Sequence, residues 1–151
     1  MKLAILLPLL ALIAPAMNAQ APANPARAPL GSMVLDWNQL VPAPTKTGER
    51  RELFDGPTRT FANAEGHVTT LEPGQSPHPA HRHPDEELVI VKEGTIEVTI
   101  NGRTQRAGPG SVFFYASEDL HGMRNVGTTR ATYFVFRFVT PALAGPPAKA
   151  P

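Results

Sequence analysis

Four side chains of the metal-binding types stand in a regular pattern in the second half of the chain. His81 and His83 are two residues apart, and on an extended strand this spacing directs both imidazoles to the same side. Glu87 keeps the same parity, and His121 follows after a further predicted strand and turn. Imidazole nitrogen and carboxylate oxygen are ligands that suit a borderline divalent ion. The pattern therefore predicts a metal site.

The surroundings of the cluster also favour a metal over a solvated loop. Polar residues this dense normally lie in water, and an H-x-H pair alone more often marks a surface loop. Here the cluster runs directly into the apolar segment 88–91, and a bound ion would satisfy polar groups that burial leaves unpaired. We interpret His78, flanked by prolines, as a loop residue, and His67 as a strand-face or pocket residue rather than a ligand.

Composition excludes several classes of protein. The 151-residue chain suits one domain and contains no cysteine, so disulfides and thiolate chemistry play no part. It holds 14 basic and 13 acidic residues with no basic run, which gives no support for nucleic-acid binding. These features exclude disulfide and thiolate chemistry and give no sign of a nucleic-acid partner.

The two ends of the chain differ from its centre. Residues 1–19 combine Lys2, a short apolar run and small residues, which is typical of a cleaved signal peptide and predicts a secreted or periplasmic protein. The alternative, a membrane anchor, needs about 20 apolar residues, and Pro8 and Pro15 interrupt the run. Residues 20–31 and 141–151 are rich in Pro and Ala and are predicted to be flexible. The folded domain is expected over residues 32–140, with no membrane association in the mature form.

Short apolar or alternating runs separated by turn residues predict an all-β sandwich or barrel. Asn101-Gly102 is a strong hairpin signal, because both turn positions tolerate positive φ. Residues 33–41, which include Trp37, are expected to add strands to an outer sheet. The predicted strands are Arg51–Phe54, Thr58–Phe61, His67–Leu71, Glu87–Lys92, Thr95–Ile100, Ser111–Tyr115, His121–Asn125 and Ala131–Val139.

Together these residues resemble the two motifs of the cupin family. The first motif is matched by Gly74, His81-Arg82-His83, Glu87 and Gly94, and the second by Gly110, His121 and Asn125. Two departures affect loop shape only: the first gap is one residue longer than usual, and Ala116-Ser117-Glu118 replaces a P-x-G turn. The resemblance spans about residues 65–138.

The resemblance implies a single-domain antiparallel jelly-roll β-barrel. It implies one divalent metal ion (Fe, Mn, Ni, Cu or Zn) held by His81, His83, Glu87 and His121, and a homodimer formed through the outer sheet. Strand parity extends the pocket, because residues two apart from His121 share its face. Asn125 has an alternative role, which is to satisfy backbone groups in a turn. The candidate substrate-binding residues are Phe113, Tyr115, Met123, Asn125 and Phe136, with Phe134 and Phe138 as further apolar lining.

Three functions are compatible with this pattern. The leading hypothesis is a metal-dependent oxidoreductase of the dioxygenase type that acts on a small organic molecule. The second is a metal-dependent isomerase, lyase or hydrolase acting on a sugar, uronate or small acid, with Glu65 or His67 as a base. The third is a non-catalytic periplasmic protein that binds a small ligand.

Overall fold

The computed structural model describes residues 27–143 of the chain. The predicted signal peptide lies outside the described residues, as do most of the two predicted flexible segments. No helix within the described residues has the length and apolar character needed to cross a membrane. The elements are a 3₁₀ helix η1 (Trp37–Gln39) and the strands β1 (Ala43–Pro44), β2 (Gly48–Gly56), β3 (Asn63–Leu71), β4 (Glu86–Glu93), β5 (Ile96–Ile100), β6 (Arg103–Ala107), β7 (Val112–Tyr115), β8 (His121–Asn125) and β9 (Ala131–Val139).

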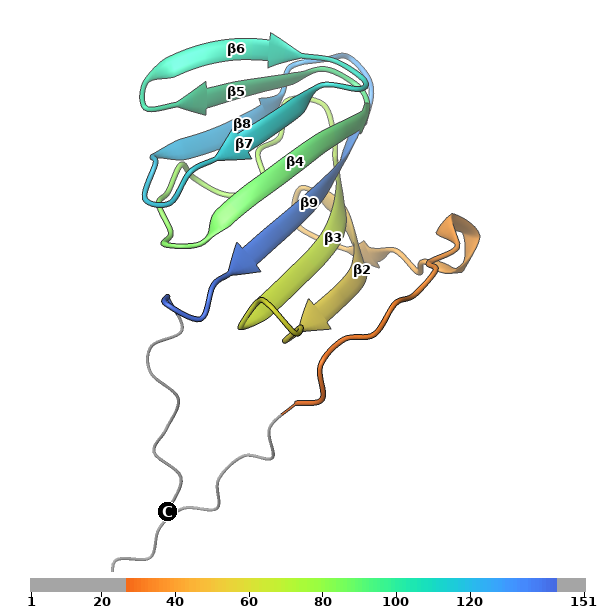
Figure 1. Cartoon of the computed structure of the whole chain (residues 1–151). Helices are drawn as coiled ribbons and strands as arrows, with labels where there is room; N and C mark the ends of the chain where they lie inside the picture. The colour runs from red at the N-terminus through yellow and green to blue at the C-terminus, as the bar shows by residue number, and fades with distance from the viewer. Residues whose placement is uncertain (1–26, 144–151) are drawn as a thin grey trace, which may run out of the picture.

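The strands form two antiparallel sheets that face each other (Figure 1). The larger sheet has the order β1-β2-β3-β9-β4-β7, and the smaller sheet has the order β6-β5-β8. This is the antiparallel jelly-roll arrangement expected of a cupin, so the predicted fold class is confirmed. An isolated bridge between His81 and His121 joins the loop before β4 to the start of β8.

The core lies between the two sheets, where inward side chains alternate with outward ones along each strand. On β4, Val89 and Val91 are buried, and on β5, Ile96 and Val98 are buried opposite them. The complete core cluster is Leu71, Val89, Val91, Ile96, Val98, Tyr115, Ala131, Tyr133 and Val135. This cluster fills the interior and holds in place the strands that surround the histidines.

Two turns position neighbouring strands. Asn101 and Gly102 both have positive φ, at 47° and 81°, which confirms the predicted hairpin turn between β5 and β6. Gly94 has φ 86°, and a Cβ there would lie 2.5 Å from the Cα of Ala131. The turn from β4 to β5 therefore needs glycine both for its backbone conformation and for its close approach to β9.

Some predicted elements were wrong. Residues Thr58–Phe61 form a turn rather than a strand, because the Thr58 hydroxyl accepts hydrogen bonds from Thr60 N and Phe61 N. The segment around Trp37 adds no strand; it contains the short η1 helix, and the Trp37 ring, which is only partly buried, packs against Phe134. Strands β1 and β6 were not predicted, and the exposed polar residues of β6 explain why no apolar alternation marked it.

Candidate metal centre

Three histidines from two distant segments meet inside the fold. Their ring centroids form a nearly equilateral triangle, with 5.2 Å between His81 and His83 and 4.8 Å from each of them to His121. Their ligand nitrogens all lie within 4.8 Å of one another. Three ligand atoms at about 2.1 Å from one ion lie roughly 3.0–3.6 Å from one another, so shifts on the order of 1 Å bring all three nitrogens to a shared ion.

The hydrogen bonds of two of these rings direct their free nitrogens toward the site. Nδ1 of His83 lies 2.8 Å from the carbonyl oxygen of Asp85, and Nδ1 of His121 lies 2.9 Å from that of Asp119. A carbonyl only accepts, so each Nδ1 donates its proton and the lone pair lies on Nε2. Both Nε2 atoms are buried without a hydrogen-bond partner among the described residues. Such orphaned acceptors fit a metal ion, which would satisfy both of them.

Burial keeps the histidines in the form that binds metals. Desolvation lowers the pKa of His81 and the pKa of His121, and positive charge on the neighbouring histidines lowers both further. Nδ1 of His81 is also buried without a partner among the described residues. The lowered pKa values of His81 and His121 favour neutral imidazole, which is the state a metal ligand requires.

Glu87 lies next to this group but outside its compact core. Its Oε2 is 3.4 Å from Nε2 of His83 and 4.0 Å from Nε of Arg137. Burial raises the pKa of Glu87, although the nearby charges of His83 and Arg137 oppose the rise. The structure thus brings together three of the four predicted ligands, with the fourth carboxylate in contact with one of them.

The loop that carries His121 forms a tight turn. Asp119 N donates to Ala116 O, and Glu118 has φ 64° at the position of the family's turn glycine. Glu118 N also donates to His83 O, which ties this turn to the histidine pair. A non-glycine residue in the left-handed region costs about 1 kcal/mol. The turn therefore forms at some cost in backbone strain.

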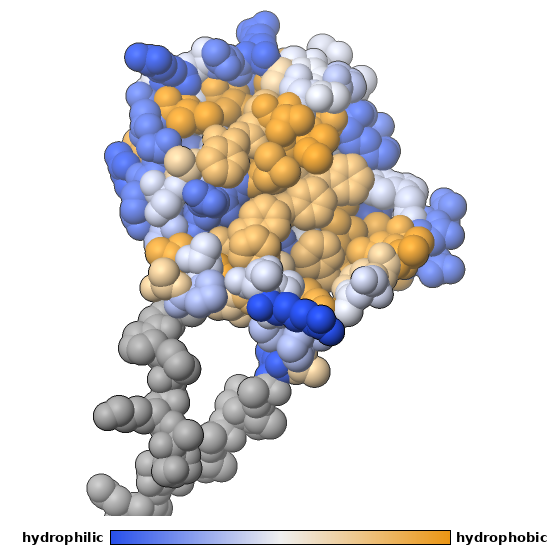
Figure 2. Space-filling view, in the orientation of Figure 1, coloured by the Kyte–Doolittle hydropathy of each residue, from blue (hydrophilic) through white to orange (hydrophobic). Residues whose placement is uncertain are grey.

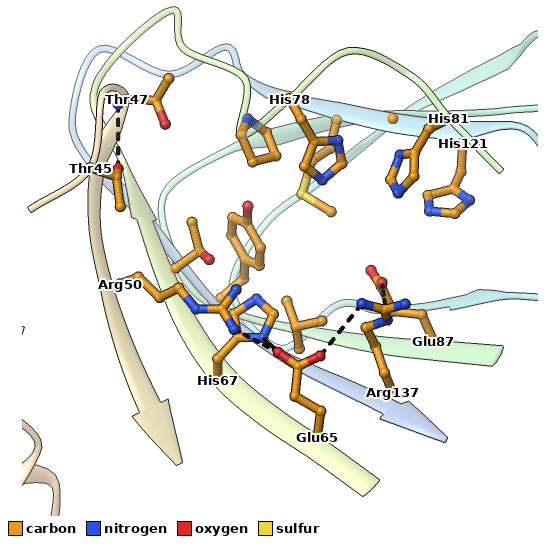
Figure 3. Close-up of a pocket in the computed structure, with 16 residues that line it drawn as sticks. Thr45, Thr47, Arg50, Glu65, His67, His78, His81, Glu87, His121 and Arg137 are labelled. Atoms are coloured by element: carbon orange, nitrogen blue, oxygen red, sulfur yellow. Dashed lines mark hydrogen bonds and ion pairs between the residues drawn. The ribbon is translucent and has the colours of Figure 1, made fainter. Parts of the chain in front are cut away.

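Two of the three clustered histidines, His81 and His121, line a cavity of about 350 Å³ (Figure 3). His78, His81 and His121 lie on one side, and Arg50, Glu65, His67 and Arg137 lie on the other. The remaining lining residues are Thr45, Thr47, Thr69, Pro77, Glu87, Gly122, Met123, Tyr133 and Val135. The wall that faces the histidines is polar, whereas the sequence predicted an apolar lining.

Glu65 organises the polar wall. Its Oε1 lies 2.6 Å from Nη2 of Arg50 and 3.0 Å from Nδ1 of His67, and its Oε2 lies 3.5 Å from Nη1 of Arg137. Arg137 also makes a two-pronged hydrogen bond to the buried Asp85 carboxylate, at 2.6 and 3.0 Å. Burial opposes ionisation of Asp85, but these bonds outweigh it and its pKa is lowered.

The predicted pocket residues take several different positions. Met123 lines the cavity, while Tyr115 is fully buried and stacks on His121. Phe113 packs against the core and lines a separate groove between β6 and β7. The side-chain amide of Asn125 binds the backbone oxygens of Leu71 and Thr129 and accepts from Gly127 N, as the alternative structural interpretation expected.

The expectation that Phe136 lines the histidine pocket was wrong. On β9 the inward side chains are Tyr133, Val135 and Arg137, so the even-numbered phenylalanines point outward. Phe136 instead stacks with Phe54, at 6.2 Å between ring centroids. The same change of face applies to Phe134 and Phe138, which contact Trp37 and Phe61. Both faces of β9 carry large side chains, so side-chain size alone did not identify the face that points inward.

Two charged residues of the cavity wall were not predicted from the sequence, Arg50 and Arg137. Arg137 is paired across strands with Glu87, so the two side chains share one face. The sequence did contain a signal for Arg137, because it is the one charged residue among the aromatic and aliphatic residues of β9. Arg50 had no comparable mark, because it belongs to a run of charged residues, Glu49–Glu52.

Comparison with known proteins supports the cupin superfamily. Residues 67–137 match the family model described as a cupin domain. A cupin described as RmlC-like, from Shewanella frigidimarina, is 17% identical with a TM-score of 0.60, over 74% of this chain and 94% of its own. A predicted oxalate decarboxylase from Thermotoga maritima is 19% identical with a TM-score of 0.60, over 71% and 99%. The polyketide cyclase RemF from Streptomyces resistomycificus is 20% identical with a TM-score of 0.60, over 74% and 82%.

No curated protein matches the chain. At these identities the structural neighbours establish the fold alone, and two of them carry names of different chemistries. Fold does not determine function, so the reaction must be argued from the site.

Proposed function

We propose that this protein is a metal-dependent enzyme that acts on a small polar molecule. The observation that carries the proposal is the pair of Nε2 atoms of His83 and His121, which are buried, have no hydrogen-bond partner within residues 27–143 and lie in one histidine group beside a cavity of about 350 Å³. His81 and Glu87 complete the proposed ligand set. A bound divalent ion would supply Lewis acidity there and, if it is redox-active, positions for dioxygen.

The first proposed reaction class is oxidation by dioxygen. A ligand set of three imidazoles and one carboxylate leaves coordination positions open on the cavity side, which is the arrangement that such chemistry needs. The test is oxygen uptake by the iron(II)-reconstituted protein with phenolic and diketone substrates. Uptake that depends on His121 would support this class, and absence of turnover with every redox metal would contradict it.

The second proposed class is isomerisation, elimination or hydrolysis without redox change. The polar wall of Arg50, Glu65, His67 and Arg137 favours it, because a polar wall binds hydroxyl, carbonyl or carboxylate groups better than an apolar lining does. Activity with zinc, which has no redox chemistry, would support this class and contradict the first. Tight binding of a small molecule without conversion would contradict both and favour a binding protein.

We also propose that the chain is exported, on the basis of the leader-like residues 1–19. N-terminal sequencing of the mature protein tests this proposal. A mature chain that begins after residue 19 or close to it would support export, and a chain that still begins at Met1 would contradict it.

We further propose that two copies associate through the outer face of the larger sheet. Val112 and Phe114 on β7 are 58% and 55% exposed, and their partners in register on β4 are Ile90 and Leu88. Figure 2 shows hydrophobic surface gathered on this face of the molecule. An apolar surface of this kind is commonly covered by a partner. Light scattering should report a dimer that Phe114→Lys converts to a monomer, and a monomeric wild-type protein would contradict the proposal.

A further inference from the structure

The cavity contains a fourth histidine, His67, on the wall opposite the metal-binding group. It lies on β3, only 8% exposed, and has no direct contact with the three clustered histidines among the described interactions. A buried imidazole facing a cavity is unusual unless a partner or a task holds it there.

Glu65 fixes the orientation of the His67 ring. The two residues are two apart on β3 and therefore share one face of the sheet. Nδ1 of His67 lies 3.0 Å from Oε1 of Glu65, whose oxygens also accept N–H groups from Arg50 and Arg137. A carboxylate in this position only accepts, so Nδ1 of His67 must carry the proton.

The opposite ring nitrogen is left with its lone pair. Figure 3 shows the Nδ1 edge of His67 bonded to Glu65 and the other edge directed into the cavity, toward the side that holds His78, His81 and His121. A histidine held by a carboxylate at one nitrogen and open at the other is the arrangement of a general base.

Burial and the charge of Arg50 keep His67 neutral. Burial and the positive charge of Arg50 lower the pKa of His67 to about 4, against the opposing effects of Glu65 and Glu52. Its cross-strand partner on β9 is the uncharged Val135, and Arg137 follows two residues later on the same face. At neutral pH the ring is therefore able to accept a proton rather than donate one.

We propose that His67, oriented by Glu65, is the proton-transfer residue of this pocket and accepts a proton at Nε2 from a small hydroxycarbonyl substrate. The C–H or O–H bond of the substrate breaks, its electron pair stays on the substrate, and the proton forms a new N–H bond on His67. The imidazolium keeps its Nδ1–H bond to Glu65 and then returns the proton to the substrate or to water. This inference rests on the proposed enzymatic function and specifies its acid–base residue.

The experiment measures proton exchange, which requires no knowledge of the full reaction. The zinc-loaded full-length protein is incubated with dihydroxyacetone in D₂O, and loss of the C–H signal is followed by NMR. His67→Gln keeps a polar amide in the cavity but accepts no proton. We expect it to lose about 10²–10⁴-fold of the exchange rate, the usual contribution of a general base, with zinc content and Tm unchanged.

A matched pair of carboxylate variants separates orientation from charge. Glu65 and Glu52 both bind Arg50, but Glu65 holds His67, whereas Glu52 is largely exposed and outside the cavity. We expect Glu65→Gln to slow the exchange far more than Glu52→Gln, because Glu52 acts on His67 only through its charge and makes no bond to the ring. Equal effects of the two variants, or an undiminished rate in His67→Gln, would overturn the inference.

The tautomer of His67 can be measured without any catalytic turnover. ¹⁵N NMR at pH 7 should show a protonated Nδ1 and a bare Nε2 in the wild-type protein, and loss of this preference in Glu65→Gln. A proton on Nε2, or a charged ring, would overturn the inference even if the protein is active. Absence of exchange in a zinc-loaded wild-type protein with the expected tautomer would count instead against the proposed enzyme.

Discussion

The ring of Tyr115 lies flat against the imidazole of His121, with centroids 4.0 Å apart and planes inclined by 13°. Tyr115 is fully buried, and its hydroxyl has no hydrogen-bond partner among the described residues. Burial raises the pKa of the Tyr115 phenol, so it stays neutral. The aromatic face of Tyr115, rather than its hydroxyl, therefore supports the orientation of His121.

Replacement of Tyr115 should separate these two contributions. Tyr115→Phe keeps the stacked ring and removes an unpaired polar group, so we expect unchanged metal affinity and a free energy of unfolding equal to wild type or about 1 kcal/mol higher. Tyr115→Leu removes the stack, and metal affinity should fall about tenfold. Isothermal titration with zinc and urea unfolding measure both effects. A loss of affinity in Tyr115→Phe would show that the hydroxyl is needed.

The close approach of Gly94 to Ala131 predicts a large difference between two glycine substitutions. Gly94 and Gly102 both have positive φ, but a Cβ at Gly102 meets nothing within 4 Å. Gly102→Ala should cost about 1 kcal/mol of backbone strain. Gly94→Ala adds a clash with the β9 backbone and should cost about 2–4 kcal/mol. Equal costs in urea unfolding would show that β9 does not pack against the turn before β5.

The bond between Arg137 and Asp85 should stabilise the folded state. Asp85 is buried, and loss of its two-pronged partner would leave a carboxylate unpaired in the interior. We expect Arg137→Met to lower the free energy of unfolding of the metal-free protein by about 2–3 kcal/mol, which is less than for a fully buried pair because Arg137 is partly exposed. The double variant with Asp85→Asn should recover part of this loss. No recovery would mean that Arg137 stabilises through packing alone.

Glu49 should make stability depend on pH. The hydrogen bond from Arg51 lowers the pKa of Glu49 below its ordinary 4.5, and Arg130 helps to outweigh the opposing effect of burial. The unfolded chain then binds this proton more tightly, so the contribution is present above pH 4.5 and is lost as pH falls through the lower folded pKa. Glu49→Gln should lower stability by up to about 1 kcal/mol at pH 7 and have little effect near pH 3.

Urea unfolding at both pH values checks this prediction. Glu93→Gln is the matched control, since Glu93 pairs with Lys92 at 3.6 Å on the exposed surface. We expect a smaller effect there, because an exposed ion pair contributes little. A cost for Glu49→Gln that is the same at both pH values would contradict the assignment.

The sequence predicted the fold and the histidine group because both depend on local spacing. His81 and His83 lie in the loop before β4, where an isolated bridge ties His81 to His121, and their two-residue spacing still brings both rings into the group. The turn at Asn101 depends on the conformational preferences of two residues. The face of β9 could not be derived in this way, because Phe136 and Val135 are both apolar. Only the register of β9 against β4, which pairs Glu87 with Arg137, decides which side faces inward.

The polar wall of the cavity was harder to predict for a related reason. Glu65, Arg50 and Arg137 come from three different strands, and their contacts depend on how these strands pair. No short-range sequence pattern indicates such a network of contacts. The role of Asn125 was ambiguous from local sequence, because an asparagine at the end of a strand fits both a turn and a pocket.

The most direct test of the account is the metal content of the protein and of three histidine variants, each purified from the compartment in which the protein naturally resides. His78→Ala is the matched control, because His78 lines the cavity beside His81 but is exposed and outside the ligand group. We predict one ion per chain in the wild type and in His78→Ala. We predict almost none in His81→Ala and His121→Ala, with all four proteins folded by circular dichroism. A folded His121→Ala variant that keeps its metal, or a wild-type protein that binds none, would contradict the central claim.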